Sequence, residues 1–430
     1  MIDILLINPP TANSSKRMSA SLTSSPPLGL MYIGSHLKHA GYKVKLIDFS
    51  VEFFNKDNFE NYLFNNSPRI IGITTYFESF GSLYVIIEFI RNRMPHIPIV
   101  LGGAAATFKY ELFFTSMNID YIIMGEGEYS FVHLADILLK NSADKLDLVK
   151  GLVYKNNNSL RITPYTRISD LNSLYFPDRG LVDLSKYALP FTISTARGCP
   201  GNCIFCSSTR FWGTKTCLRS VDNIYDEVLY LKEVYQMKYF FIVDDTFTIN
   251  PKRTTAFAKK LILNQLDLFW GCESRVDIVT EELLEILYES GCRKIQFGLE
   301  SADNNILRKI EKNTTKEQVY RAVSIASRIG YNVNVSFIIG HPFDTHETVE
   351  DTLDYVFKLR EEFNISPYAS ILVPYPGTDI YQNASKYGLQ ILSDNFDNYR
   401  IDRAIIKTSH LTDNDLRYYY QKFLNKLINN

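Results

Sequence analysis

The sequence of 430 residues has no apolar run close to the roughly 20 residues that a membrane-spanning helix needs. Its 6 cysteines are too few for a disulfide scaffold and fit a reducing compartment. The charges nearly cancel, with 46 Lys and Arg against 47 Asp and Glu, so the basic excess of a large nucleic-acid surface is lacking. We therefore expect a cytoplasmic protein with no membrane span and no nucleic-acid partner.

Three further absences concern the first part of the chain. No Gly-x-Gly-x-x-Gly follows the first expected strand, which disfavours a dinucleotide site. No Asp-x-His-x-x-Gly occurs in residues 8–30, and residues 1–190 contain no cysteine at all. Any cofactor of this region is therefore bound without a cysteine ligand and without a histidine from that motif.

What is present is the composition of a well-cored enzyme, with 46% hydrophobic and 13% aromatic residues. In residues 1–140, apolar segments alternate with helical ones, which predicts an α/β, doubly wound (Rossmann-like) parallel sheet. The expected strands are residues 2–7, 44–48, 70–74, 97–101 and 121–124. Ligands on such a sheet bind beyond the carboxyl ends of the strands.

The rest of the chain divides into three parts. Residues 141–190 form a connector with a hairpin that turns at Asn156–Asn158. From residue 191 to 385 the alternation resumes, and six β/α units predict a partial (β/α)6 barrel that is open on one side. Residues 386–430 form a short tail that ends in a helix, expected over 414–428.

The densest chemical motif is C-x3-C-x2-C, made by Cys199, Cys203 and Cys206. Iron–sulfur clusters are held by thiolates from such short runs, and a cubane cluster needs four ligands. The run supplies three, so one iron is left open. Ile204 and Phe205 lie between the ligands, and we expect them to shield the cluster from water.

Two other kinds of site were weighed for these cysteines. A structural zinc ion takes four ligands, usually as two separated pairs, and no second C-x2-C or H-x3-H occurs in the chain. Cys217, Cys272 and Cys292 have no partner at metal-binding spacing, and we interpret them as small buried hydrophobic residues. The spacing therefore favours an open [4Fe-4S] cluster.

The motif follows a strand and Arg197-Gly198, and in this it resembles the radical S-adenosylmethionine (SAM) superfamily. The resemblance implies that the open iron chelates the amino and carboxylate groups of SAM's methionine part. The reduced cluster then cleaves SAM to a 5′-deoxyadenosyl radical. It also implies an electron donor such as flavodoxin or ferredoxin.

The N-terminal region is similar to the cobalamin-binding domain of cobalamin-dependent radical SAM enzymes. The similarity lies in Asn8-Pro9-Pro10, Pro26–Leu30, Gly102-Gly103 and Gly125–Glu128. It implies cobalamin as a cofactor, and by position the contacting residues are Pro27, Leu28, Gly29, Thr74, Thr75, Gly102, Gly103, Gly125 and Glu126. Where the family often has Gly-Gly-x-His, this chain has Gly102-Gly103-Ala104-Ala105. An alternative is a cobalamin-type domain that is empty or helps to bind substrate.

The same resemblance places SAM at the carboxyl ends of the barrel strands. The positions implied are Asp244, Asp245, Glu273, Arg275, Glu300, Ser301, Lys312, Ser336, Gly340 and Pro376. Asp245 has an alternative role as a helix cap, and Lys312 has one as a solvated lysine. We expect Glu273 and Arg275 to form an ion pair at the barrel mouth.

These residues predict a radical SAM enzyme that methylates an unactivated carbon of a biosynthetic intermediate. By resemblance, one SAM gives the radical, methylcobalamin donates the methyl group and a second SAM restores it. The alternative is a cyclisation, rearrangement or carbon–carbon coupling without methyl transfer. A transfer-RNA methylthiotransferase is excluded, because it needs further cysteines in residues 1–190. The substrate is a small molecule, a peptide or a lipid, and we assign no residue to bond making at the substrate.

Overall fold

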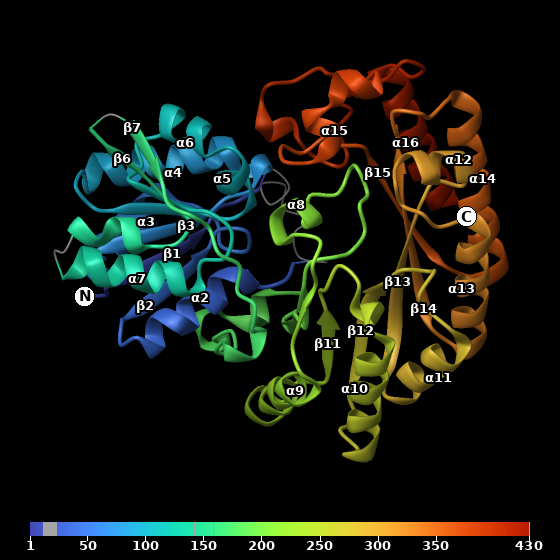
Figure 1. The fold of residues 1–430 in the computed structure, drawn as a ribbon, viewed down its shortest axis with the longest axis horizontal. Coiled ribbons are helices and arrows are strands. Elements are labelled where there is room, and N and C mark those ends of the chain that lie inside the picture. The colour runs from blue at the N-terminus through green and yellow to red at the C-terminus, as the bar shows by residue number, and fades with distance from the viewer. Residues whose placement is uncertain (12–23, 141–142, 158, 430) are drawn as a thin grey trace. The chain divides into compact units, whose positions relative to one another are not determined.

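The computed structural model describes residues 1–11, 24–140, 143–157 and 159–429, which form two units, Met1–Pro190 and Phe191–Asn430 (Figure 1). Asn158 of the expected hairpin turn lies outside the described residues. Within those residues, no helix combines the length and the apolar character that a membrane crossing requires. Each unit is built on its own sheet.

The first unit contains a seven-stranded sheet in the order β2-β1-β3-β4-β5-β6-β7. Its first five strands are all parallel, and the change of direction in their order lies between β1 and β3. This is the doubly wound arrangement predicted from the sequence, with a ligand crevice at the carboxyl ends. The bounds are β1 Ile4–Asn8, β2 Val44–Asp48, β3 Ile70–Thr74, β4 Ile99–Gly102 and β5 Tyr121–Ile123.

Helices cover both faces of this sheet. Successive residues of β1 point to opposite faces, and Ile4–Ile7 are nevertheless all fully buried. The helices are α2 Leu28–His39, α3 Lys56–Asn66, α4 Phe80–Arg93, α5 Ala104–Phe108, α6 Tyr110–Ser116 and α7 Glu128–Leu139. Helix α3 was not expected from the sequence. This helix buries little more than Phe59 and Leu63, so its apolar periodicity is weak.

The connector is part of this unit rather than a separate link. Its strands β6 (Leu152–Asn156) and β7 (Ser159–Ile162) pair antiparallel and extend the sheet beyond β5. Leu152 and Val153 are fully buried at that edge. Burial of these two apolar side chains stabilises the packing of the hairpin on the sheet.

The second unit is built on six parallel strands in the order β15-β14-β13-β12-β11-β8, with β8 and β15 at the edges. The strands are β8 Thr192–Ile193, β11 Tyr239–Ile242, β12 Phe269–Ser274, β13 Cys292–Glu300, β14 Asn332–Ile339 and β15 Ser366–Ile371. Between them run α9 Val221–Tyr235, α10 Pro251–Leu263, α11 Glu281–Glu289, α13 Lys316–Ile329 and α14 His346–Phe363, which pack as sequential neighbours (Figure 1). The parallel strands and the helices between them agree with the predicted β/α alternation.

The two faces of the sheet differ in burial. On β13, Ile295, Phe297 and Leu299 are fully buried, as expected for side chains beneath the helices. The alternate residues Gln296 and Gly298 are only partly buried. Side chains alternate between the two faces of a strand, so the second face is open and carries small or polar residues. This open face is where a ligand has room.

The tail covers the edge strand β15. Ile371, the last residue of β15, donates its backbone N–H to Ile401 at 2.7 Å. The final helix, α16 (Asp413–Asn429), packs on β14 and β15 and buries Leu416 and Phe423. An uncovered edge strand invites pairing with other chains, so the tail closes a vulnerable edge.

A glycine between α11 and β13 tests this fold. Gly291 has φ +98°, and a Cβ there would lie 2.0 Å from the backbone oxygen of Leu268. Replacing Gly291 by Ala should lower the free energy of unfolding by about 2 kcal/mol or more, since the backbone must move. Thermal unfolding of the cluster-free protein measures this. Gly29→Ala is the matched control, because its Cβ meets nothing within 4 Å among the described residues. An unchanged free energy of unfolding in the Gly291 variant would contradict the close approach of Gly291 to Leu268.

Candidate active site

The cysteine motif lies in a loop after β9 (Ala196–Arg197), which pairs with β10 (Cys217–Leu218) in a two-stranded ladder. Cys199, Cys203 and Cys206 are free thiols and partly buried. A Cβ built at Gly201 would lie 3.4 Å from the Cys199 sulfur and 3.9 Å from the Cys203 sulfur. Both sulfurs therefore lie next to Gly201. A side chain at this position would occupy space that a bound cluster needs.

Ile204 fixes the middle of the cysteine loop. Its N–H donates to the carbonyl of Ile310 at 3.1 Å, and its own carbonyl accepts from the N–H of Ile380 at 3.0 Å. Ile310 follows the helix after β13, and Ile380 lies in the helix after β15. Ile204 is 2% exposed, which confirms its predicted burial. The loop is thereby tied to two strand ends at once.

Phe205 is only partly buried, and it faces the ring of His341 at a centroid distance of 5.6 Å. His341 is fully buried, and this burial lowers its pKa to about 4. The imidazole is therefore neutral at pH 7. The structure thus places an aromatic pair, rather than a charged histidine, beside the cysteine loop.

The thiols themselves are hard to ionise in this form. Burial raises the pKa of Cys206 to about 11. Burial also raises the pKa of Cys203, while the positive charges of Lys312 and Arg275 oppose it. Metal ligation requires thiolates. Loading the site therefore releases protons, and the two cations lower the cost of ionising Cys203.

The arrangement of the cysteines limits the kind of metal centre that they could hold. Among the described residues, no three His, Cys, Asp or Glu side chains converge on the position of a single ion. A cubane cluster does not need such convergence, because its thiolates bind different iron atoms. Separated cysteines around a glycine fit a cluster better than a zinc ion.

Glu300 and Lys312 form a buried ion pair on the open face. Lys312 Nζ lies 2.8 Å from Glu300 Oε1, with the two side chains 11% and 10% exposed. Lys312 is therefore not a solvated lysine. Burial lowers its pKa, but the negative charge of Glu300 raises it by more, so the pKa lies above its usual value. A Cβ at Gly298 would lie 2.3 Å from Glu300 Oε1, so the glycine makes room for the pair. Glu300 itself has φ +66°, a strained backbone for a non-glycine residue.

The remaining positions implied for SAM lie around this pair or behind it. Ser336 on β14 is partly exposed and stands opposite Gly298 in the strand register. Ser301 is buried, and its hydroxyl accepts the N–H of Asp303 at 3.2 Å. Gly340 has φ +94° at the end of β14, and Pro376 is buried in the loop after β15. Contact of these residues with SAM stays a prediction.

The expected ion pair between Glu273 and Arg275 is wrong. Arg275 instead binds Asp277, with Nε and Nη2 3.0 and 2.9 Å from its carboxylate oxygens, and Nη2 donates to the Lys312 carbonyl at 2.9 Å. The reason is that β12 ends at Ser274, so Arg275 lies beyond the strand and turns away. Burial, with the charges of Asp245 and Glu300, raises the pKa of Glu273 to about 7.

The raised pKa shows that the folded state disfavours the ionised form of Glu273, which lowers stability at a pH where the unfolded chain is ionised. The cost of Glu273 is absent below its unfolded pKa of 4.5, grows as the pH rises and is complete above about 7. Glu273→Gln should therefore stabilise the cluster-free protein by about 1–3 kcal/mol near pH 8 and have no effect near pH 4.5. Thermal unfolding against pH measures this. A variant that is less stable near pH 8 would contradict the assignment.

Asp244 and Asp245 differ although they are adjacent. Asp244 is buried, and its carboxylate accepts the N–H groups of Thr195 at 2.6 Å and Ala196 at 3.0 Å. It therefore points towards the chain that enters the cysteine loop. Asp245 is exposed and accepts the hydroxyl of Ser208 at 2.5 Å. The alternative of Asp245 as a cap is wrong, because Asn250 caps α10.

In the first unit, the expected cobalamin residues lie at the carboxyl ends of β3, β4 and β5 and at the start of α2. Some of them already have protein partners. Thr75 is fully buried, and its hydroxyl donates to the Gly102 carbonyl at 2.8 Å and accepts the N–H of Ala106 at 2.9 Å. Glu126 accepts the hydroxyl of Tyr165 at 3.1 Å and the N–H of Ile168 at 2.7 Å. These two side chains hold the loops in place.

The glycines of this region fall into two kinds. Gly103 and Gly125 have φ of +93° and +69°, and a Cβ on either would meet protein atoms. Among the described residues, a Cβ at Gly29 would meet nothing within 4 Å, and one at Gly102 would meet only the Ile123 carbonyl oxygen, at 3.6 Å. The fold does not require glycine at Gly29 or Gly102, so both positions leave space for a bulky ligand such as cobalamin. Pro27 and Leu28, beside Gly29, are buried and partly buried.

Family profiles match both units of the chain. The profile described as "Radical SAM superfamily" matches residues 193–356, and the one described as "B12 binding domain" matches residues 18–135. The first range contains the three cysteines of the motif, and the second contains the residues expected to contact cobalamin.

Curated proteins and solved structures match over nearly the whole chain. An uncharacterized methyltransferase of Pyrococcus horikoshii is 33% identical over 97% of this chain and 90% of its own length. The anaerobic magnesium-protoporphyrin IX monomethyl ester cyclase of Rubrivivax gelatinosus is 28% identical over 93% and 74%. The radical SAM methyltransferase TsrM of Kitasatospora setae, solved with cobalamin and a [4Fe-4S] cluster, superposes with a TM-score of 0.78 at 18% identity, over 99% of this chain and 88% of TsrM. This last likeness shows a shared fold.

Proposed function

The chain belongs to the radical SAM superfamily, in the group with a B12-binding domain, and from this premise we propose that it is a cobalamin-dependent C-methyltransferase. Its substrate carbon is an unactivated one in a biosynthetic intermediate. The observation that carries the proposal is the set of three thiols, Cys199, Cys203 and Cys206, beside the buried pair Glu300–Lys312. The relative in Pyrococcus horikoshii supports methyl transfer.

When they are bound, the cluster and SAM supply a radical that removes a hydrogen atom from the substrate, and cobalamin supplies the methyl group. Cys199, Cys203 and Cys206 would hold the cluster. Lys312 and Arg275 lower the pKa of the Cys203 thiol against its burial and so favour the thiolate that binds iron. These two cations offset part of the effect of burial, and the pKa of Cys203 stays above that of a free thiol until the cluster binds.

Glu300 would orient SAM. One of its carboxylate oxygens is held by Lys312 at 2.8 Å, which fixes the side chain and leaves acceptor positions for hydroxyl or ammonium groups. Ser336 and Gly298 are opposite each other in the strand register. Both are small and only partly buried, so they leave space next to Glu300. This combination of a fixed acceptor and a small neighbour suits a ligand with a ribose and an amino acid group.

Water must be excluded from a radical site, and the chain has two elements that can do so. Ile204 is buried at the centre of the cysteine loop, and its carbonyl binds Ile380 after β15. The segment 376–378, which follows β15, is also buried. An external reductant such as flavodoxin or ferredoxin would then deliver electrons to the cluster.

Anaerobic reconstitution with iron, sulfide and hydroxocobalamin tests the proposal. After desalting, the absorbance spectrum should show a cluster and about one cobalamin per chain, because the chain has one motif for each. Cys203→Ala should lose the cluster absorbance and keep cobalamin. Loss of neither signal in that variant would overturn the assignment of the cysteine loop.

The relative that is a cyclase supports a second candidate, radical chemistry without methyl transfer. Incubation with methyl-labelled SAM and candidate substrates separates the two. Label in the product supports methylation. Formation of 5′-deoxyadenosine with an unlabelled, cyclised or rearranged product supports the alternative, and a cluster-loaded protein that retains no cobalamin removes the methyl donor altogether.

The glycine at the end of β4 allows the cobalamin site to be tested without disturbing the fold. Gly102→Ala adds a Cβ that has only an ordinary contact with Ile123. Its thermal stability should be unchanged, while cobalamin binding weakens by roughly tenfold because the methyl group occupies ligand space. Equilibrium titration with hydroxocobalamin measures this. Equal affinity in the variant would place cobalamin elsewhere.

A further inference from the structure

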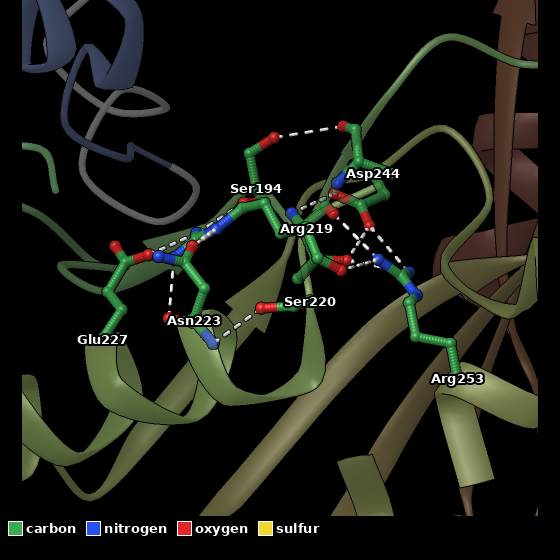
Figure 2. A network of polar contacts seen from close by, with 9 residues as sticks. Ser194, Arg219, Ser220, Asn223, Glu227, Asp244 and Arg253 are labelled. Atoms are coloured by element: carbon green, nitrogen blue, oxygen red, sulfur yellow. Dashed lines mark hydrogen bonds and ion pairs between the residues drawn. The ribbon is translucent and has the colours of Figure 1, made fainter. Parts of the chain in front are cut away.

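A polar network holds the segment that leads into the cysteine loop (Figure 2). Of its members, only Asp244 was among the positions implied for SAM. We propose that Asp244 and Arg253, supported by Arg219, are positioning residues that hold segment 194–196 and thereby fix the placement of Cys199. The inference rests on the proposed function, since it concerns the cluster that Cys199 would hold. It goes beyond that function by assigning to Asp244, whose carboxylate is bound by Thr195 and Ala196, and to the two arginines the task of holding the loop.

Thr195 is the centre of the network, and all three of its polar groups are held. Its N–H donates to Asp244 at 2.6 Å, and its hydroxyl also donates to that carboxylate. Its carbonyl accepts from Arg253 Nη1 at 2.8 Å, and its hydroxyl accepts from Arg253 Nη2 at 3.1 Å. Figure 2 shows Asp244 and Arg253 converging on this segment. Thr195 is fully buried, so water does not compete for these bonds.

Arg219 holds the same segment from the other side. Its Nη1 donates to the carbonyl of Ser194 at 2.9 Å, and its N–H donates to the carbonyl of Thr195 at 3.0 Å. Glu227 pairs with its guanidinium at 2.5 Å, and Asn223 accepts from its Nε at 2.6 Å. Arg219 directly follows β10, which pairs with the strand that carries Arg197.

The local backbone explains why side chains are needed. β8, β9 and β10 are each two residues long, so few ladder hydrogen bonds hold the chain before Cys199. The loop must nevertheless present a sulfur at a fixed point. Asp244 closes β11 and holds Thr195, and two residues later Thr246 places its hydroxyl 4.0 Å from the Cys199 sulfur. One strand end therefore fixes the loop both before Cys199 and beside it.

The charges make the network costly as a device for stability alone. The side chains of Asp244, Arg253, Arg219 and Glu227 are 1%, 8%, 4% and 1% exposed. Buried ion pairs contribute little net stability compared with apolar residues of similar volume, and the buried Nε of Arg253 has no hydrogen-bond partner among the described residues. The other bonds of the network hold the backbone of segment 194–196 in one geometry. A fixed geometry is what a cluster ligand requires.

The test uses reconstituted protein and four readouts: iron content, the EPR spectrum of the reduced cluster with SAM, its midpoint potential and the rate of 5′-deoxyadenosine formation. Asp244→Asn keeps all three cysteines, so iron content should equal that of the parent protein. The EPR spectrum and midpoint potential should shift, and the rate should fall roughly 10- to 100-fold, because Cys199 is displaced. Arg253→Lys keeps a charge beside Asp244 but loses the forked contact to Thr195, and it should show a smaller shift in the same direction.

Two further variants separate positioning from stability. Asp244→Asn with Arg253→Gln removes both charges and should recover thermal stability, while the spectral shift and the low rate remain. Tyr331→Phe is the matched control: it loses a buried bond to the Leu284 carbonyl of 2.7 Å near the start of β14 and should lower stability without changing the EPR spectrum.

Each outcome is decisive. A parent-like spectrum and rate in both Asp244→Asn and Arg253→Lys, with only a lower melting temperature, would overturn the proposal, as would recovery of the rate in the double variant. Failure of the parent protein to bind iron or to cleave SAM would count against the proposed function and is visible before any variant is made.

Discussion

The site depends on one constraint: a loop with almost no regular structure must hold three thiols in fixed places. The ladder of β9 and β10 is two residues long and cannot do this alone. The loop is therefore bound by groups that stand at the ends of strands β11, β13 and β15. Ile204 binds to the segments after β13 and β15, and segment 194–196 binds to Asp244 at the end of β11.

The parallel sheet makes this arrangement possible. All six strands of the second unit run in one direction, so their carboxyl ends meet at the same edge. Fully buried apolar residues on one face of β13 and β14 attach the helices and leave the other face open. The open face tolerates Glu300 and Lys312 because each charge has the other as its partner and Gly298 leaves space for both.

The first unit uses a similar edge for a different purpose. The side chains of Thr75 and Glu126 tie its loops together, whereas Gly29 and Gly102 leave free volume that the fold does not fill. Rigid loops around unfilled space are what a bulky, tightly bound cofactor needs. The two units thus share one principle, in which buried polar contacts fix the backbone and small residues leave room for the ligand.

The sequence by itself determined the order of elements and the kind of metal centre. Apolar runs and helical periodicity are local signals, so β2 and β3 begin and end where they were predicted. The spacing of the three cysteines is also local, and it indicated an open cluster without any structure.

Only the tertiary structure decided which charges meet. Thr195 and Arg253 are 58 residues apart, and no spacing in the sequence connects them. Arg275 turned to Asp277 because β12 ends one residue earlier, and Lys312 was revealed as buried only by its partner Glu300. Pairing of this kind depends on where strand ends come together in space, and that is a property of the folded chain rather than of any segment of it.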